Sequence, residues 1–213
     1  MSIAIQPGEA IGPEAARQFR AIYEASFPPA ERDDPISLLA SIASGERTCH
    51  LAVDEADVVG FAVALPLKDV PAFFLEYLAV EPTNRNQGIG QLLLHHVRSR
   101  LAEHDGKIAG AIFEVERPED AIVEEQDLRR RRIGFYLRNG AFVVGCADRY
   151  RAPRLDDHGT LAFQLMWLPV VGNTSSAPKG ELLRRCVSAI LTQSYGLDAT
   201  DPLVRSNLEA LSC

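Results

Sequence analysis

Apolar residues are arranged along this chain in two ways. In some stretches they are consecutive or alternate with polar residues, as in β-strands; in others they recur every three or four residues, as in amphipathic helices. The predicted strands cover residues 2–6, 48–53, 58–65, 73–80, 107–116, 141–151 and 160–168. The predicted helices cover residues 13–27, 35–44, 128–139, 181–195 and 202–211, together with a helix that starts at Ile89 and stops at Gly106. This mixture of strands and helices predicts an α/β fold.

The stretch around residues 73–80 is the most informative part of the pattern. Eight nearly uninterrupted apolar residues predict a strand buried on both faces, and Pro82 closes it. Gly88 and Gly90 follow in a loop that opens directly into the helix at Ile89. Glycine lets the backbone turn tightly and approach a ligand, and the first amides of a helix are unpaired donors at the positive end of its dipole. The stretch therefore predicts a cradle for an anionic phosphate group.

Two common nucleotide motifs are absent from this loop. The dinucleotide fingerprint needs a third glycine at the position of Leu93, and the Gly-Lys-Ser/Thr of a Walker loop does not occur. The pattern Arg85-x-x-Gly88-x-Gly90, after a strand that ends Leu78-Ala79-Val80, resembles the acyl-CoA signature of the GNAT superfamily of N-acyltransferases. The alternative is a glycine turn that only joins a strand to a helix.

The resemblance extends over the element order from about residue 3 to residue 169. It implies a central mixed, mostly antiparallel sheet of about seven strands flanked by helices, within an acetyltransferase domain of residues 1–170. Residues 171–213 would be a linker and a C-terminal helical extension. It also implies acetyl-CoA as acyl donor, held by these residues: Leu78, Ala79, Val80, Arg85, Asn86, Gln87, Gly88, Ile89 and Gly90.

A second block, Phe135-Tyr136-x-x-x-Gly140-Ala141-Phe142, is similar to the helix and strand that close the CoA site in this superfamily. The resemblance implies that Tyr136 returns a proton to the departing thiolate. A phenol suits that role because its ordinary pKa near 10 keeps it protonated at neutral pH. The alternative is that Tyr136 packs beside Ile133 as a core aromatic residue.

Three carboxylates lie inside apolar strand sequence, where an unpaired charge is costly: Glu76, Glu114 and Glu116. An amine acceptor has to lose a proton before it attacks, so each is a candidate base. Strand alternation places Glu114 and Glu116 on one face, where they could share base and amine-binding duties. Each glutamate could instead be paired with an arginine for structural reasons.

Composition and charge restrict the classes of partner that the protein is expected to bind. The 46% hydrophobic and 24% charged fractions are those of a globular protein, and the net charge of -7 argues against nucleic acid or an anionic membrane as the main partner. No stretch is long and apolar enough to span a membrane, and the N-terminal residues lack a secretory pattern, so we expect a cytoplasmic protein. Four scattered cysteines predict free thiols, with neither a disulfide framework nor a metal site.

Together these features predict an enzyme that moves an acetyl group from acetyl-CoA to a primary amine of a small molecule or peptide. Two other interpretations stay open: a non-catalytic acyl-CoA sensor, and an interaction protein in which the C-terminal helices are the working part. Leu183, Val187 and Ile190 form an apolar stripe that must be buried, either on the same chain or in a homodimer.

Overall fold

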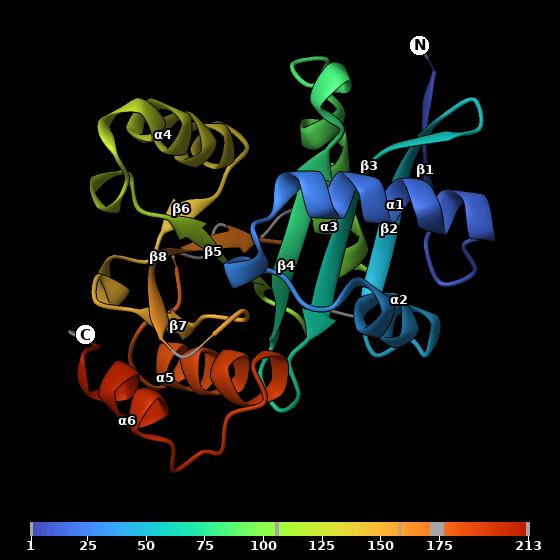
Figure 1. Cartoon of the computed structure of the whole chain (residues 1–213). Coiled ribbons are helices and arrows are strands. Elements are labelled where there is room, and N and C mark those ends of the chain that lie inside the picture. Colours follow the sequence, from blue (N-terminus) through green and yellow to red (C-terminus); the bar gives the residue numbers. More distant parts are fainter. Residues whose placement is uncertain (1, 105–106, 158, 171–176, 212–213) are drawn as a thin grey trace. The chain divides into compact units, whose positions relative to one another are not determined.

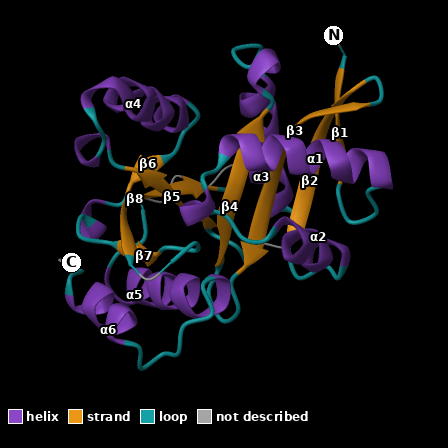
Figure 2. Cartoon of the chain, viewed as in Figure 1, coloured by secondary structure: helices purple, strands orange, loops and turns teal. Residues whose placement is uncertain are grey.

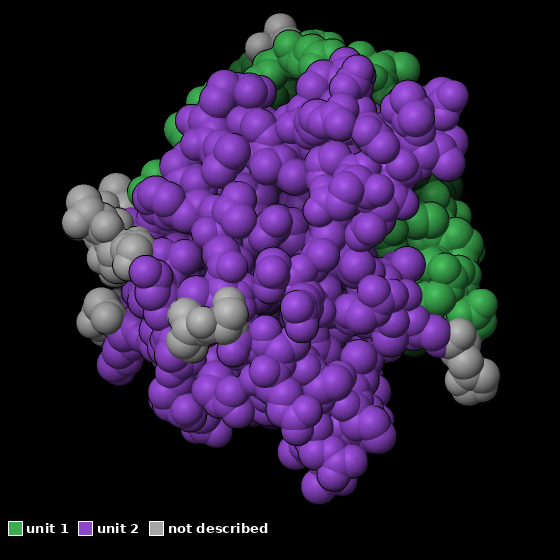
Figure 3. All heavy atoms as spheres, turned by 90° about the vertical axis from the view of Figure 1, so that its left-hand side faces the viewer, with its two compact units in different colours: residues 1–66, 75–100, 154–158 green, residues 67–74, 101–153, 159–213 purple. Residues whose placement is uncertain are grey.

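The structure is a computed structural model of the 213-residue chain, and it describes residues 2–104, 107–157, 159–170 and 177–211. The chain divides into two compact units (Figure 3). Unit 1 comprises residues 1–66, 75–100 and 154–158, and unit 2 comprises residues 67–74, 101–153 and 159–213. Strand β4 is continuous through the division, since Ala72–Phe74 belong to unit 2 and Leu75–Val80 to unit 1.

The fold is a mixed α/β arrangement (Figures 1 and 2). The strands are β1 (Ile3–Pro7), β2 (Thr48–Asp54), β3 (Asp57–Pro66), β4 (Ala72–Val80), β5 (Gly110–Glu116), β6 (Phe142–Val143), β7 (Arg151–Pro153) and β8 (Thr160–Pro169). The α-helices are α1 (Pro13–Ser26), α2 (Pro35–Ala43), α3 (Ile89–Ala102), α4 (Val123–Arg138), α5 (Gly180–Ala189) and α6 (Pro202–Glu209). Within the described residues, no helix is long and apolar enough to cross a membrane.

Strand pairing runs in the order β1-β2-β3-β4-β5-β8-β6, with β7 added beside β8. The β4–β5 pair is parallel, whereas β5, β6 and β7 each pair antiparallel with their neighbour β8. The described residues thus form eight strands where the sequence predicts about seven, and the predicted mostly antiparallel sheet is confirmed.

In unit 1, helices cover both faces of the strands β1 to β4. One face packs against α1 and α2 through a core that includes Phe19, Leu38 and Phe61. The other face meets α3, because Leu93 lies against Gly60 and the rings of His50 and His96 are 4.6 Å apart. Figure 1 shows α1 and α2 in front of these strands and α3 behind them.

In unit 2, β5 and β8 form the centre. They pair over seven residues, and a Cβ added at Gly110 would lie 2.5 Å from the indole of Trp167, so glycine is needed there. The C-terminal helices pack in this unit. The apolar stripe that α5 begins is fully buried within the chain, since Leu183 and Val187 of α5, and Ile190 directly after it, are each 0% exposed.

Three local predictions are wrong. The predicted strand 141–151 is broken into β6, a short turn and β7, because a 3₁₀ turn at Gly145–Ala147 interrupts it. Helix α4 starts at Val123, five residues before the predicted Leu128, and acidic residues at its start complement the helix dipole. Cys146 is disulfide-bonded, although Cys49 and Cys186 are free and buried as expected.

Candidate functional site

The predicted phosphate cradle lies between β4 and α3. Asn86 and Gly88 have positive φ angles of 64° and 84°, so the chain reverses sharply here before the helix begins at Ile89. Glycine adopts this conformation without the strain that a Cβ causes. The amide of Leu92 makes a 3.0 Å bond to the Gly88 carbonyl, which is the start of the α-helical ladder. The amides before Leu92 are in the first turn, where helical donors have no intrahelical partner.

Main-chain groups of β4 lead into this loop. The amide of Glu81 donates to the Val59 carbonyl on β3 at 2.9 Å. Along a strand, the main-chain groups of successive residues point to opposite edges, so those of Leu78 and Val80 point away from β3. Within unit 1, β4 is the outermost strand in the pairing order. Arg85 donates from Nε to the Val80 carbonyl at 3.1 Å, which holds its guanidinium group at the loop.

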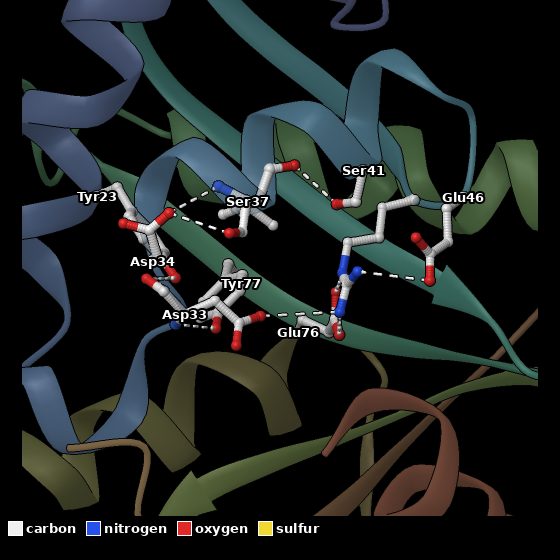
Figure 4. A network of polar contacts seen from close by, with 10 residues as sticks. Tyr23, Asp33, Asp34, Ser37, Ser41, Glu46, Glu76 and Tyr77 are labelled. Carbon is white, nitrogen blue, oxygen red and sulfur yellow. Dashed lines mark hydrogen bonds and ion pairs between the residues drawn. The ribbon is translucent and has the colours of Figure 1, made fainter. Parts of the chain in front are cut away.

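Glu76, on the same strand, has an arginine partner. Arg47 donates to its two carboxylate oxygens at 2.7 and 3.1 Å, and the side chains of Glu76 and Arg47 are only 4% and 10% exposed. Asp33 and Glu46 approach the same guanidinium group at 3.7 and 3.9 Å. Figure 4 shows these three carboxylates in one network. Glu76 is therefore held as a carboxylate in a buried ion pair.

Asp33 is a member of this network that the sequence analysis did not identify. Its backbone amide donates to the Tyr77 hydroxyl at 3.2 Å, and its carbonyl accepts from the Tyr23 hydroxyl at 3.3 Å (Figure 4). Burial raises the pKa of the Asp33 carboxyl, against the opposing effect of Arg47. No sequence signal distinguishes Asp33 from other acidic residues in the charged connector between α1 and α2.

Glu114, in unit 2, is held by two tyrosines. The hydroxyl of Tyr150 donates to its Oε1 at 2.5 Å, and the hydroxyl of Tyr195 donates to its Oε2 at 2.6 Å. Burial, and then the Glu114 charge, raise the pKa of Tyr150 well above its ordinary value, so that phenol stays protonated as a donor. Sequence reasoning missed both tyrosines, because each comes from a segment distant from β5.

Glu116 has different partners. Arg132 forms a close ion pair with it, and Arg129 lies 3.7 Å away, both on α4. Glu114 and Glu116 are two residues apart on β5 and so share one face of the strand. Their partners nevertheless differ, because Glu114 is bonded to phenols and Glu116 to guanidinium groups.

Tyr136 lies on α4 with its ring packed on β5. The ring centroids of Tyr136 and Phe113 are 4.5 Å apart, and Tyr136 is 8% exposed. Burial raises the pKa of its phenol to about 12, against the opposing effect of the Arg132 charge. The phenol therefore stays protonated at physiological pH, and the ring also fills a core position.

The structure divides the predicted site residues into two sets. The glycine loop, the end of β4 and Glu76 belong to unit 1. Glu114 and Glu116, on β5, and Tyr136, on α4, belong to unit 2. Among the described residues, no group of three or more metal-ligating side chains is present.

Comparison with known families finds a match. The profile of the GNAT acetyltransferase domain matches residues 45–140, which include β4, the glycine loop, α3, β5 and the whole of α4. The GNAT assignment therefore holds for residues 45–140, a little under half of the chain. This match supports acyltransferase activity in general. A search of curated proteins found no match.

Solved structures of GNAT proteins share the fold. A protein assigned to the GNAT family from Bacteroides thetaiotaomicron is 24% identical, with a TM-score of 0.67 over 92% of this chain and 99% of that chain. An aminoglycoside 6'-N-acetyltransferase complexed with coenzyme A is 18% identical, with a TM-score of 0.62 over 81% and 99%. A GNAT-like decarboxylase in complex with isobutyryl-CoA is 20% identical, with a TM-score of 0.57 over 78% and 98%. At these identities the likeness establishes the fold alone.

Proposed function

We propose that this GNAT protein transfers an acetyl group from acetyl-CoA to a primary amine, by direct attack of the amine on the thioester in a ternary complex. The observation that carries the proposal is the loop of Asn86 and Gly88 at the start of α3, directly after β4. Helix-start amides and Arg85 suit the pyrophosphate of CoA. The main-chain groups of Leu78 and Val80 suit the pantetheine arm, which carries amides of its own.

The residues of the loop fit this donor. Nothing lies within 4 Å of a Cβ built on Gly88, so the space beside its backbone is open to a ligand. We assign the whole predicted set to the CoA contact: Leu78, Ala79, Val80, Arg85, Asn86, Gln87, Gly88, Ile89 and Gly90.

The three candidate bases differ in the chemistry of their partners. Glu76 and Glu116 accept from guanidinium groups, whose positive charge lowers the proton affinity of a carboxylate. Glu114 accepts two short hydrogen bonds from neutral phenols, which orient it and lower its proton affinity less than a full positive charge does. We therefore assign the base role to Glu114, and a structural role to Glu76 and Glu116.

Tyr136 is the proposed proton donor to the thiolate of CoA. The buried phenol keeps its proton at physiological pH, as a donor must. The hydrogen bond that it gives to the developing thiolate would stabilise the leaving group in the transition state.

The proposed acceptor is cationic before it reacts. A net charge of -7 favours approach of a positively charged amine over an anionic acceptor. One GNAT neighbour is an aminoglycoside acetyltransferase, and another is a ribosomal-protein-S18-alanine N-acetyltransferase from Escherichia coli, so the fold serves both small molecules and proteins.

One observation favours a second candidate, a non-catalytic acyl-CoA sensor. Tyr136 is 8% exposed and packed against Phe113, as expected of a residue that only stabilises a fold. A sensor binds acetyl-CoA without releasing its thiol.

Release of free CoA thiol distinguishes the two candidates. The purified protein would be incubated with acetyl-CoA and a panel of amino sugars, polyamines and peptides, and the thiol measured with a chromogenic disulfide. An enzyme releases thiol with at least one amine, and Tyr136→Phe lowers the rate by about a hundredfold or more. Acetyl-CoA binding with no thiol release across the panel would favour the sensor.

A further inference from the structure

A side chain of the C-terminal extension donates a hydrogen bond to Glu114, the candidate base. Tyr195 lies beyond residues 45–140, the part that matches the GNAT domain profile. Its hydroxyl nevertheless donates to Glu114 Oε2 at 2.6 Å, while Tyr150 donates to Oε1 at 2.5 Å. The two phenols thus occupy one oxygen each of the same carboxylate, which fixes the carboxylate plane as well as its position.

The backbone before Tyr195 has an unusual turn. Helix α5 ends at Ala189 and continues as a π-helical turn over Ile190–Ser194, and the amide of Tyr195 bonds to the Ile190 carbonyl at 3.3 Å. A π-turn contains one residue more than an α-turn, which rotates the following side chain by roughly 100° about the helix axis. The turn therefore changes the direction in which Tyr195 leaves the helix.

This turn is anchored without the help of Tyr195. The side-chain amide of Gln193 accepts from the Lys68 backbone amide at 2.8 Å and donates to the Lys68 carbonyl at 3.3 Å. Further along the extension, the Asn207 side chain accepts from the backbone amide of Arg151 and donates to its carbonyl, both at 2.9 Å. Together with the fully buried apolar stripe of α5, these contacts hold the extension in unit 2.

The phenol of Tyr195 has a different effect from these anchors. Tyr195 and Glu114 are each partly exposed, so their bond is at the edge of the packed region rather than inside it. A hydrogen bond between a phenol and a carboxylate restricts the carboxylate rotamer and favours its ionised form. A carboxylate that is ionised and already oriented is ready to accept a proton from an ammonium group.

We propose that Tyr195 is a positioning residue for Glu114, so that the C-terminal extension forms part of the acyl-transfer site. The proposal rests on the proposed function for its catalytic consequence. In the step concerned, the N–H bond of the acceptor ammonium breaks, its electron pair stays on nitrogen, and the proton forms an O–H bond with Glu114. Tyr195 and Tyr150 hold the carboxylate in place and are not consumed.

The first test needs no acceptor. Protein labelled with ¹³C at the glutamate carboxyl carbons is titrated by NMR, and Glu114→Asp or Glu114→Gln assigns the resonance. In Tyr195→Phe, Glu114 should take up its proton about one pH unit higher than in the wild type, the shift expected when one hydrogen bond to an ionised group is lost. Gln193→Ala, which removes an anchor of the same turn but no bond to Glu114, should leave the titration unchanged.

Two results would overturn the proposal: an identical Glu114 titration in the wild type and Tyr195→Phe, or an equal shift in Gln193→Ala. If Tyr195→Phe does not fold, 3-fluorotyrosine placed at position 195 serves instead. Its more acidic phenol strengthens the hydrogen bond, so Glu114 should then take up its proton at a lower pH than in the wild type. A fluorinated protein that titrates like the wild type would also contradict the positioning role.

The second test uses the acceptor found by thiol release. Tyr195→Phe should lower kcat by about tenfold with KM for acetyl-CoA unchanged, and should move the acid limb of the pH–rate profile upward. In a Glu114→Gln background the same substitution should have no further effect on kcat, because the two residues act on one step. Independent, multiplicative losses in that cycle would refute the coupling. Failure of acetyl-CoA to bind would instead refute the proposed function, whereas the carboxyl titration tests the bond between Tyr195 and Glu114 whether or not acetyl-CoA binds.

Discussion

Replacement of Arg47 by methionine tests whether the buried ion pair with Glu76 is structural. Arg47 makes two hydrogen bonds to the Glu76 carboxylate, at 2.7 and 3.1 Å, and both side chains are at most 10% exposed. Methionine fills much of the same volume but leaves a buried carboxylate without this partner. Removal of one member of a buried pair typically costs about 3–5 kcal/mol.

The loss of unfolding free energy in Arg47→Met has an upper limit that depends on pH. Glu76 can take up a proton instead of staying charged, and at about 1.4 kcal/mol per pH unit this costs about 4 kcal/mol at pH 7 from an ordinary pKa near 4.3. At pH 5 the same protonation costs only about 1 kcal/mol. We therefore predict a loss of unfolding free energy of about 3–4 kcal/mol at pH 7 that shrinks to about 1 kcal/mol at pH 5.

Urea unfolding at both pH values measures this loss. The matched control is Arg17→Met, since Arg17 pairs with Glu14 on the surface with side chains 71% and 64% exposed, and solvent screens such a pair so that its loss should hardly change stability. The double variant Arg47→Met, Glu76→Met should recover most of the stability. A loss below about 1 kcal/mol at pH 7, or one that does not change with pH, would refute the structural role and reopen Glu76 as the base.

Three further outcomes follow from the structure. Gly110→Ala places a Cβ 2.5 Å from β8 and should cost about 1–3 kcal/mol in thermal unfolding, whereas Gly145→Ala, with nothing within 4 Å, should cost far less; equal costs would refute the packing argument. Burial, with His96 and Arg100, lowers the pKa of His50 from 6.5 to about 4, so the unfolded state binds more protons between these values and stability falls as pH drops from 6.5 to 4. His50→Gln should remove up to about 3 kcal/mol of that change in unfolding free energy with pH, whereas the surface substitution His95→Gln should leave the change as it is in the wild type. Urea unfolding measured across this pH range tests the difference. Tyr136→Phe should lower kcat with acetyl-CoA affinity unchanged, and unchanged turnover in a stopped assay would assign Tyr136 to packing alone.

The sequence was most informative where one local rule decides the structure. The helix starts at Pro13, Pro35 and Pro202 and the tight turn at Gly88 agree with the structure because each depends on neighbouring residues only. The strand–loop–helix unit around the cradle was predicted for the same reason.

Predictions failed where the local structure depends on contacts with residues far away in the sequence. Val144 donates to the Leu165 carbonyl at 2.9 Å, and the following turn at Gly145 breaks a run that resembles a single strand in sequence. The partners of the strand glutamates were also beyond reach, because Arg47, Tyr150 and Tyr195 come from separate segments. Apolar context predicted correctly that each carboxylate needs a partner, but it carries no information on whether that partner is a guanidinium group or a phenol.

Calorimetric titration of the protein with acetyl-CoA tests the central claim most directly. The wild type should bind in a one-to-one complex, and Gly88→Glu, Gly90→Glu, which places side chains and negative charge at the cradle, should abolish binding while the protein stays folded by circular dichroism. Dephospho-CoA as a second ligand shows how much of the affinity comes from the 3'-phosphate. Absence of binding to the folded wild type, or equal binding by the glutamate variant, would contradict the assignment of this loop to an acyl-CoA donor.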